Sequence, residues 1–455
     1  SDKDVALRLE EYGPNQLEET EGRHPLSILA AQFTEVMVII LIILVISGLP
    51  LFAGILTAAM LGLHVSGVEF TAIPIEIFRL ANAPVLLAIP LFTFAGYLLS
   101  QGGTSTRLVR FSRSLFGWLP GGLGVVALVS CAFFTAITGA TGITIIALGG
   151  LLFPALISEK YEENFSLGLI TTSGSLGLHF PPSLPIILYG FVSGTSIEQL
   201  FMAGLLPGVL MVGIPCLFSV YMGRKWRLEQ PPFSGREFLA ALKGAAWELP
   251  IPILILAGIY SGFCTATEAA ALTVAYVLFV KTLIFRELSL LRDLPVIMKE
   301  SMKMVGGIMI ILGAALGFTN YLVDAFIPMK ILELMEGLVS SKIGFLMILN
   351  IFLILVGCMM DIFSAILVVV PLIVPLAVQF GIDPVHLGIV FLANLGIGYN
   401  TPPVGLNLFI ASSRFDKPIM QLYKATLPFL LLLLFALLLI TYWPGLSLFL
   451  PNLLK

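Results

Sequence analysis

Long apolar segments constrain this chain more than any other feature of its sequence. A helix needs about 17 to 25 apolar residues to cross the hydrocarbon core of a bilayer. Segments of this kind span about residues 34–62, 83–100, 200–221, 247–263, 267–285, 303–323 and 424–448. Charged residues make up 11% of the 455 positions, against about 25% in soluble domains. The sequence therefore predicts an all-α polytopic membrane protein and excludes a single water-soluble globule.

Two other apolar regions are interrupted near their middle by small and polar residues. The region 121–157 breaks at Thr138-Gly139-Ala140-Thr141, and the region 343–378 breaks at Asp361-Ile362-Phe363-Ser364. Each half is about 14 to 17 residues long, which is short for a full crossing. We therefore predict two re-entrant helical hairpins whose tips lie at membrane depth.

Each predicted hairpin is followed by a segment that contains glycines and a Pro-Pro pair. The first reads Ser173-Gly174-Ser175-Leu176-Gly177-Leu178-His179-Phe180-Pro181-Pro182, and the second reads Asn394-Leu395-Gly396-Ile397-Gly398-Tyr399-Asn400-Thr401-Pro402-Pro403. A proline removes a backbone donor and disfavours helical geometry at the residue before it. Both segments are therefore predicted to be discontinuous helices.

The two halves of the chain match each other at a constant spacing. Adding 221 to a residue number takes Gly177 to Gly398 and Pro181 to Pro402, and it places the tip 137–142 over residues 358–363. The hairpin tip, the glycine and the Pro-Pro pair all keep this spacing without an insertion or a deletion. An internal repeat explains the match.

Basic residues predict how the repeats are oriented. They cluster before the first hairpin and after several apolar segments, whereas residues 191–199 and 379–385 contain no Lys or Arg. If the basic loops and the N-terminus are cytoplasmic, five crossings separate the hairpins, and this odd number inverts the second repeat. Both tips then meet near the midplane, as in secondary transporters with inverted repeats and broken helices.

Irregular backbone at membrane depth must be buried in protein or line a cavity, so the four interruptions are the predicted site. Half-helix N-termini suit a substrate carboxylate, and freed carbonyl, hydroxyl and amide oxygens suit sodium. The candidate sodium ligands are Thr138, Gly139, Thr141, Ser173, Gly174, Ser175, Asp361, Ser364, Asn394, Gly398 and Asn400. The candidate substrate-binding residues are Ser175, His179, Pro181, Pro182, Asn400, Thr401 and Pro402. The alternative is that the glycines and prolines only kink packed helices.

Four side chains leave two interpretations open. Asp361 is an intramembrane carboxylate that either serves a cation or gating site or caps the hairpin tip. His179 either contacts substrate or donates to a freed carbonyl. Glu268 either caps a helix or takes part in transport, and Arg414 either attracts an anion or marks the cytoplasmic end of the second broken helix.

From about Leu49 to the C-terminus, the chain resembles the large membrane subunit, the DctM-type permease, of tripartite ATP-independent periplasmic (TRAP) transporters. The resemblance rests on Ala88-Ile89-Pro90-Leu91-Phe92, Phe180-Pro181-Pro182-Ser183-Leu184-Pro185, Ala203-Gly204-Leu205-Leu206-Pro207-Gly208, Thr265-Ala266-Thr267-Glu268-Ala269-Ala270 and Thr401-Pro402-Pro403-Val404-Gly405-Leu406-Asn407-Leu408-Phe409. The chain departs from the family where Thr138-Gly139-Ala140-Thr141 replaces a frequent Ser-Gly-Ser-Ala and where Ala266 replaces the usual proline.

This resemblance implies an elevator-type, sodium-coupled importer of organic acids in the bacterial inner membrane, and no enzyme. Its implied partners are a small DctQ-type membrane subunit, a periplasmic substrate-binding protein, the lipid bilayer and the organic acid, for example a C4-dicarboxylate. The co-transported sodium ion is expected without an organic cofactor. A net charge of −3 indicates no nucleic-acid partner.

The predicted organisation follows from these features. Residues 49–120 form scaffold helices, 121–190 form transport repeat 1, 191–342 form scaffold helices and connecting arms, 343–412 form transport repeat 2, and 413–455 form the C-terminal membrane helix.

Residues 1–48 are different, because 10 of the 51 charged residues lie between positions 1 and 24. Leu7-Arg8-Leu9-Glu10-Glu11-Tyr12-Gly13-Pro14-Asn15 resembles the N-terminus of P-type cation-transporting ATPases. The phosphorylated Asp-Lys-Thr-Gly-Thr sequence of those pumps does not occur. A fragment of such a pump is one alternative to the transporter interpretation, and a binding-protein-independent sodium/dicarboxylate symporter is another.

Overall fold

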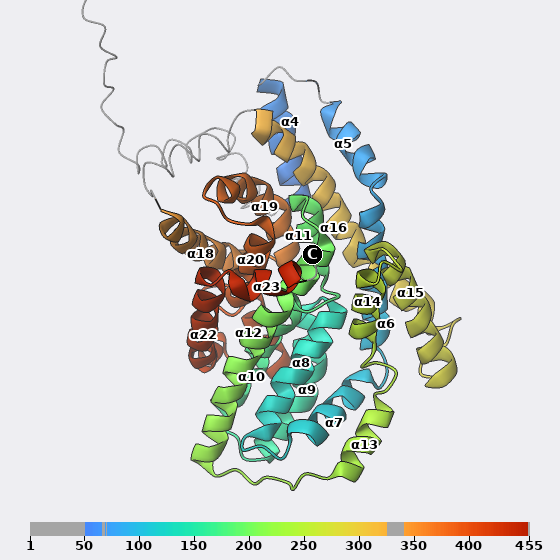
Figure 1. Ribbon diagram of the computed structural model, residues 1–455, viewed down its shortest axis with the longest axis vertical. Helices are drawn as coiled ribbons and strands as arrows, with labels where there is room; N and C mark the ends of the chain where they lie inside the picture. The colour runs from blue at the N-terminus through green and yellow to red at the C-terminus, as the bar shows by residue number, and fades with distance from the viewer. Residues whose placement is uncertain (1–50, 66–68, 70, 325–340, 454–455) are drawn as a thin grey trace, which may run out of the picture.

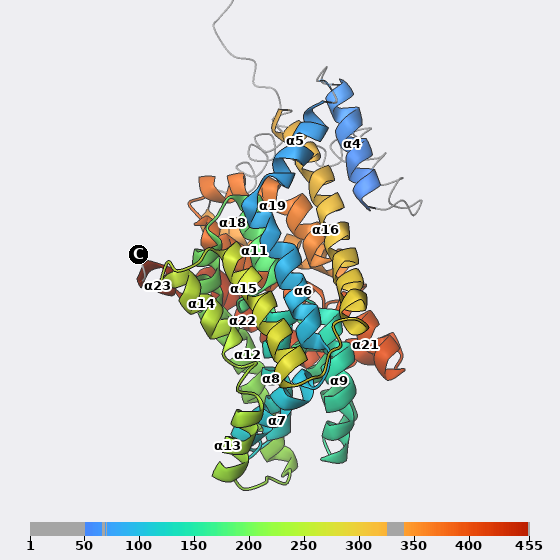
Figure 2. The same ribbon diagram turned by 90° about the vertical axis from the view of Figure 1, so that its right-hand side faces the viewer.

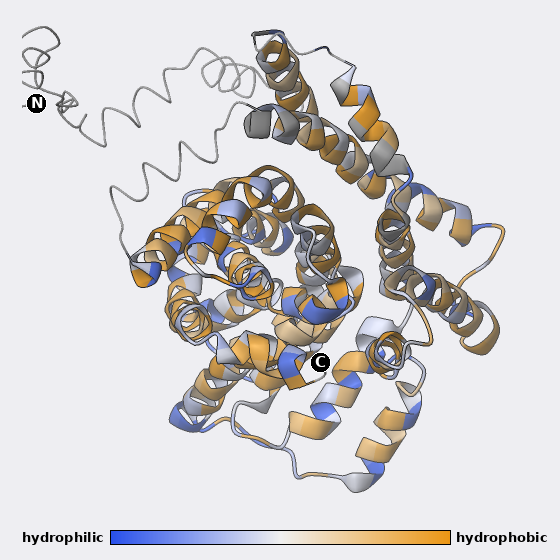
Figure 3. Ribbon diagram, turned by 45° about the horizontal axis from the view of Figure 1, so that its top comes forward, coloured by the Kyte–Doolittle hydropathy of each residue, from blue (hydrophilic) through white to orange (hydrophobic). Residues whose placement is uncertain are grey.

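The computed structural model describes residues 51–65, 69, 71–324 and 341–453, and the predicted N-terminal segment 1–48 lies outside them. Every regular element in these ranges is helical. Seven helices are long and apolar enough to cross a membrane, or up to eight if a bent pair counts as one span. Hydrophobic positions run along most of the helices (Figure 3). The predicted class, an all-α polytopic membrane protein, is confirmed.

One group of helices forms what we call the frame, to the right in Figure 1. It contains α4 (Leu51–Val65), α5 (Ala72–Ala81), α6 (Ala88–Ser100), α14 (Ile251–Tyr260), α15 (Ala266–Phe279) and α16 (Asp293–Asp324). Helix α16 packs against α4, α5 and α6, and α15 packs against α6. The amphipathic helices α7 (Thr104–Phe116) and α13 (Gly235–Gly244) pack on each other at one end of the molecule (Figure 2).

The remaining helices form what we call the paired bundle. Its first half contains α8 (Gly122–Thr138), α9 (Thr141–Ser158), α10 (Glu163–Ser173), the 3-10 turn η2 (Leu176–His179) and α11 (Leu184–Ser193). Its second half contains α18 (Lys342–Met359), α19 (Ile362–Gln379), α20 (Pro384–Gly398) and α21 (Leu406–Phe415). Three further helices, α12 (Ile197–Trp226), α22 (Ile419–Tyr442) and α23 (Gly445–Leu453), pack against these.

The bounds of the helices repeat at the spacing found in the sequence. Adding 221 to the bounds of α9 gives those of α19, and the other three pairs agree to within a few residues. The first broken helix bends by 46° between residues 179 and 184. The second is interrupted over residues 399–405. Both Pro-Pro peptide bonds, Pro181–Pro182 and Pro402–Pro403, are cis.

Two predictions about segment length are wrong. Helix α8, with 17 residues, has the predicted length, but α9, α18 and α19 have 18 each and are long enough to cross a membrane, because each hairpin turns within two residues. Gly139 makes the first turn with a φ of 67°, and Ala140 is extended. Because such short turns leave long helical arms, the length of an arm does not distinguish a hairpin from a membrane crossing. In contrast, the segments 83–100 and 247–263 form helices of only 13 and 10 residues. A 3-10 turn precedes the first of them, α6. Gly262, with a φ of 70°, follows the second, α14.

Candidate functional site

The first helix break packs closely against the first hairpin. A Cβ atom at Gly177 would lie within 2.6 Å of the Ala136 nitrogen, an approach that only glycine permits. The Thr135 hydroxyl donates to the Gly174 carbonyl over 3.0 Å and lies 2.6 Å from the Thr144 hydroxyl of α9. These contacts hold the broken backbone of residues 174–177 against both arms of the hairpin.

The second break makes the equivalent contact with the second hairpin. A Cβ atom at Gly398 would lie 2.6 Å from the Cα of Gly357. These two residues stand 221 positions after Gly177 and Ala136. The same pair of positions thus forms the close approach between break and hairpin in both halves.

Hydrogen bonds from the tip of the second hairpin reinforce this packing. The Gly405 N–H donates to the Cys358 carbonyl over 2.9 Å. The Ile362 N–H donates to the Tyr399 hydroxyl. Unsatisfied backbone groups at the break are therefore paired with the tip of the hairpin, as burial requires.

The two breaks meet in a buried polar junction formed by Ser175, Asn400 and Asn407. The Asn400 amide nitrogen donates to the Ser175 hydroxyl over 3.0 Å and to the Gly396 carbonyl over 2.9 Å. The Asn407 amide nitrogen donates to the Asn400 Oδ1 over 3.3 Å and to the Thr171 carbonyl over 3.5 Å. Residues from both halves of the chain thus share one hydrogen-bond network.

Two of the three junction residues, Ser175 and Asn400, are among the predicted site residues. Asn407 was missed, although it is the only amide side chain between the second Pro-Pro pair and Arg414 in the sequence. Its Oδ1 is buried and has no hydrogen-bond partner among the described residues. An oxygen of this kind is available to a cation.

Several hydroxyls of the predicted site donate to backbone carbonyls of their own helices, which leaves their oxygen lone pairs free. The Thr138 hydroxyl donates to the Phe134 carbonyl over 2.9 Å, and the Ser173 hydroxyl donates to the Ile170 carbonyl over 2.8 Å. The Thr401 hydroxyl donates to a carbonyl one turn earlier, over 2.9 Å. Gly139 and Thr141 form the hairpin turn itself.

Asp361 caps α19 at the tip of the second hairpin. One carboxylate oxygen accepts from the Phe363 N–H at 3.0 Å and from the Ser364 N–H at 3.1 Å. The other oxygen accepts from the Ser364 hydroxyl. The structure thus shows the capping geometry, and a cation or gating role stays a prediction.

His179, Pro181 and Pro182 are buried, whereas Pro402 is exposed. A Cβ atom at Gly204 of α12 would collide with the His179 carbonyl. Neither ring nitrogen of His179 has a hydrogen-bond partner in the described part of the chain. The predicted bond from His179 to a freed carbonyl is therefore absent, and its contact with substrate stays a prediction.

Asn394 lies outside the junction, in a second buried polar network. Its amide nitrogen donates to the Asn350 Oδ1 over 2.8 Å, and the Asn350 amide nitrogen donates to the Thr441 hydroxyl over 3.2 Å. His386 continues this network to Ser447, with 2.6 Å between ring nitrogen and hydroxyl. The network ties α18 and α20 to α22 and α23.

Glu268 and Arg414, the other two side chains with two interpretations, have structural partners. Glu268 forms a capping box with Thr265, in which the Glu268 carboxylate accepts from the Thr265 N–H over 2.8 Å. The Arg414 Nε donates to the Ile146 carbonyl of α9 over 3.1 Å. Helix capping is thus confirmed for Glu268, and Arg414 links α21 to α9.

A charged cluster that the sequence did not reveal lies between α7 and the ends of the frame helices. Arg107 is 2.5 Å from both Glu248 and Glu287, and Lys281 is 2.8 Å from Glu287. The side chains of Glu248 and Lys281 are fully buried. Burial raises the pKa of Glu287, but hydrogen bonds from Arg107 and Lys281 outweigh it and lower that pKa to about 2. The cluster fixes α7 to the loops beside α14 and α15.

The chemistry of the junction limits what it can bind. The described residues contain no group of three or more His, Cys, Asp or Glu side chains that could hold a metal ion. The junction instead offers hydroxyl, amide and carbonyl oxygens, which are ligands of hard cations and not of zinc or copper.

Comparison with known protein families identifies the chain. The family model described as "Tripartite ATP-independent periplasmic transporter, DctM component" matches residues 30–446. The model of the "Cation transporter/ATPase, N-terminus" matches residues 1–47. Both predicted resemblances are therefore confirmed.

Individual relatives agree with the first family. The C4-dicarboxylate TRAP transporter large permease protein DctM of Rhodobacter capsulatus is 35% identical over 91% of this chain and 98% of its own length. The isethionate TRAP transporter permease protein DctMQ of Oleidesulfovibrio alaskensis is 34% identical over 93% of this chain and 66% of its own length. The ectoine TRAP transporter large permease protein TeaC of Halomonas elongata is 31% identical over 92% of this chain and 99% of its own length.

The fold also resembles a solved transporter structure. The YdaH transporter of Alcanivorax borkumensis superposes with a TM-score of 0.58 at 15% identity, covering 83% of this chain and 88% of that one. At this identity the likeness concerns the fold alone. The family match over residues 30–446 shows that the chain belongs to the DctM family of TRAP transporter large permeases, so it is a multi-pass membrane protein and not an enzyme.

Proposed function

We propose that this permease imports an organic acid, a C4-dicarboxylate or another carboxylate, by coupling its entry to sodium. The observation that carries the proposal is the junction of Ser175, Asn400 and Asn407, where two matched helix breaks meet. Relatives are named for C4-dicarboxylates, isethionate and ectoine, so the proposal stops at the class of substrate.

We further propose that α8–α9 and α18–α19 are re-entrant hairpins in two inverted repeats. The matching helix bounds and the matching close approaches at Gly177 and Gly398 support this arrangement. The basic residues before α8 and after α12 favour a cytoplasmic face at that end, with the N-terminus on the same side. The permease would then lie in the bacterial inner membrane.

In the proposed mechanism, the two halves of the paired bundle, about residues 121–190 and 343–412, slide as a unit against the other helices. The frame contacts the bundle where α6 meets α8 and α11 and where α16 meets α19. Helices α6, α8, α11 and α19 are largely apolar in sequence, and apolar surfaces have no directional bonds to break when they slide. The charged cluster lies between α7 and the frame, outside these contacts.

Sodium and substrate would bind together at the junction. The Ser175 hydroxyl, the Asn400 and Asn407 amide oxygens and the carbonyls of Gly174 and Gly398 supply oxygens for the ion. The tip residues Thr138, Gly139, Thr141, Asp361 and Ser364, with Ser173 of α10, would close around it. Asn394 stays a candidate ligand through its buried Oδ1, which has no hydrogen-bond partner among the described residues. The positive ion and the half-helix N-termini beside Pro181-Pro182 and Pro402 would attract the carboxylate, with His179 and Thr401 nearby.

The sodium site can be tested at the junction. We expect Ser175→Ala and Asn400→Ala each to raise the sodium concentration for half-maximal uptake by about tenfold, because losing one hydrogen-bonding oxygen to a charged partner costs about 1.5 kcal/mol. Uptake by proteoliposomes over a range of sodium concentrations measures this shift. Ser193→Ala, which removes a hydroxyl from the other end of the same broken helix, is the control. Unchanged sodium dependence in both junction variants would rule out these ligands.

Dependence on partners is the second proposal. The family consists of components of tripartite periplasmic transporters, so we propose a small DctQ-type membrane subunit and a periplasmic substrate-binding protein as partners. Proteoliposomes that contain the permease and small subunit should take up the acid only after the binding protein is added. Comparable uptake without it would favour the binding-protein-independent symporter.

The pump alternative is opposed by the sequence itself. The described helices contain no soluble insert for nucleotide binding, and the full sequence lacks the phosphorylated Asp-Lys-Thr-Gly-Thr motif.

A further inference from the structure

An apolar groove of about 780 Å³ lies between the frame and the paired bundle. Val129 and Phe133 of α8 form one wall, Val209 and Leu217 of α12 form another, and Leu256 of α14 closes the third side. Every lining residue is apolar. The groove opens to the side of the molecule, since Val209 is 61% exposed and Leu217 is 71% exposed.

The groove has the length of an acyl chain. Its lining on α12 runs from Leu205 to Val220, which at 1.5 Å per residue is about 22 Å. This exceeds the roughly 15 Å depth of one leaflet of a bilayer whose hydrocarbon core is about 30 Å thick. A laterally open apolar groove of this length, in a helix bundle that crosses the membrane, meets lipid chains along its whole extent.

A basic residue continues the same face of α12. Positions 209, 213, 217 and 220 line the groove, and Arg224 follows Val220 by one helical turn, so it stands over the end of the groove. Arg224 is exposed and forms no ion pair in the described part of the chain. Nearby Arg110 and Arg113 differ, because they pair with Glu237 and Glu159. An uncompensated cation at the mouth of an apolar groove complements a negatively charged lipid headgroup.

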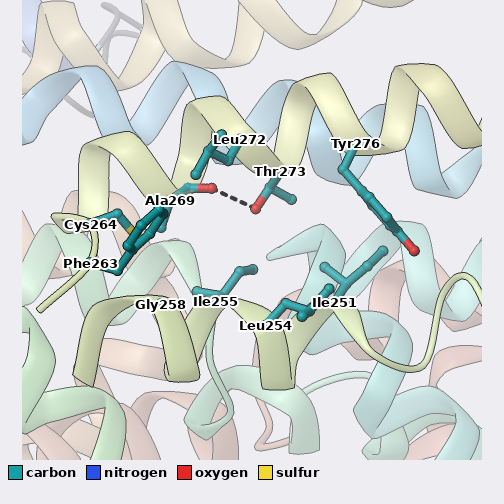
Figure 4. A pocket seen from close by; sticks show the side chains of 10 residues that line it. All are labelled: Ile251, Leu254, Ile255, Gly258, Phe263, Cys264, Ala269, Leu272, Thr273 and Tyr276. Carbon is teal, nitrogen blue, oxygen red and sulfur yellow. Dashed lines mark hydrogen bonds between the residues drawn. The ribbon is translucent and has the colours of Figure 1, made fainter. Parts of the chain in front are cut away.

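A second apolar pocket does not share these features. It has a volume of about 360 Å³ and lies between α14 and α15, where Ile251, Ile255, Leu272 and Tyr276 line it (Figure 4). Both of its walls belong to the frame, and its lining includes no residue of the paired bundle.

We propose that the groove between α8, α12 and α14 binds one acyl chain of an anionic phospholipid, whose headgroup is held by Arg224. Lipid binding needs only the groove and the cation, so it does not depend on the proposed transport function. If the paired bundle slides past α14, the bound acyl chain fills the space between them and sets the rate of that movement. This second part rests on the proposed function.

Native mass spectrometry of the purified permease in detergent tests the binding. With dioleoylphosphatidylglycerol and dioleoylphosphatidylcholine as probes, we expect phosphatidylglycerol to be retained about fivefold more, the effect of one basic residue beside an anionic headgroup. Arg224→Gln should bring the two lipids to equal retention, whereas the control Arg110→Gln should keep the preference.

A variant that fills the groove separates the acyl chain from the headgroup. A Cβ atom at Gly213 meets no atom within 4 Å, so the side chain of Gly213→Leu starts from open space in the lining of the groove. It should lower retention of both lipids about tenfold, because it displaces at least two methylene groups of the chain. Gly306→Leu on α16, where a Cβ also meets nothing within 4 Å, should change neither.

Two results would overturn the proposal. One is equal retention of phosphatidylglycerol by the wild type and by Gly213→Leu and Arg224→Gln. The other is loss of the lipid when the small membrane subunit is co-purified, which would make the groove a protein interface. Neither result depends on transport. A failure of sodium-coupled uptake in proteoliposomes would therefore not contradict the lipid site.

Discussion

Replacing Gly398 by alanine is expected to abolish uptake and to lower the free energy of unfolding by about 3 kcal/mol, the upper part of the usual cost of overpacking. The added methyl group would lie 2.6 Å from the Cα of Gly357, and a backbone atom cannot rotate away as a side-chain end can. The second hairpin must therefore separate from α20, and Gly405 would lose its hydrogen bond to Cys358.

Gly396 provides a control on the same helix. A Cβ atom there meets nothing closer than 3.6 Å, so Gly396→Ala should keep uptake and stability, or gain up to about 1 kcal/mol from the lost flexibility of glycine. Thermal unfolding in detergent and proteoliposome uptake measure both variants. Gly177→Ala should repeat the loss in the first half of the chain. Similar behaviour of Gly396→Ala and Gly398→Ala would contradict this account of the close approach.

The charged cluster predicts the second large effect. Arg107→Met should lower the free energy of unfolding by about 3 to 5 kcal/mol, because it leaves a buried carboxylate without its cation. Glu248 is fully buried, its Oε2 has no hydrogen-bond partner among the described residues, and Arg107 supplies its ion pair. Thermal unfolding of the purified permease measures the change.

Arg110→Met is the matched control, since the pair between Arg110 and Glu237 is more than half exposed on both sides. An exposed ion pair contributes about 0 to 1 kcal/mol, so this variant should unfold close to the wild type. In the double variant Arg107→Met with Glu248→Gln, the uncompensated charge is gone and much of the stability should return. Equal destabilisation by Arg107→Met and Arg110→Met would mean that burial of the cluster does not matter.

The breaks were predictable because the residues that cause them are local. Pro181-Pro182, Pro402-Pro403 and the glycines around them disfavour helix wherever they stand, so the sequence located both interruptions and their spacing of 221 residues. Ser175 and Asn400 could be chosen for the same reason, since each stands beside a break. Their contact was expected only in general terms, as a meeting of two tips near the midplane.

The errors concern properties that depend on neighbours distant in the chain. Asn394 stays a candidate ligand, but the sequence could not show that its amide nitrogen donates to Asn350 of α18. One interpretation gave His179 a hydrogen bond to a freed carbonyl, yet neither ring nitrogen has a partner among the described residues, and α12 packs over the His179 carbonyl at Gly204. The lengths of three hairpin arms, α9, α18 and α19, were underestimated because two-residue turns leave nearly all of each segment helical.

The sequence by itself determined the membrane class, the family, the internal repeat and the positions of the helix breaks, because apolar run length and backbone restriction act within a few residues. Only the tertiary structure decided which polar groups meet. The junction of Ser175 with Asn400, the cluster of Arg107, Glu248 and Glu287, and the groove ending at Arg224 each join residues from separate helices. Packing of those helices, and not any local preference, sets these contacts.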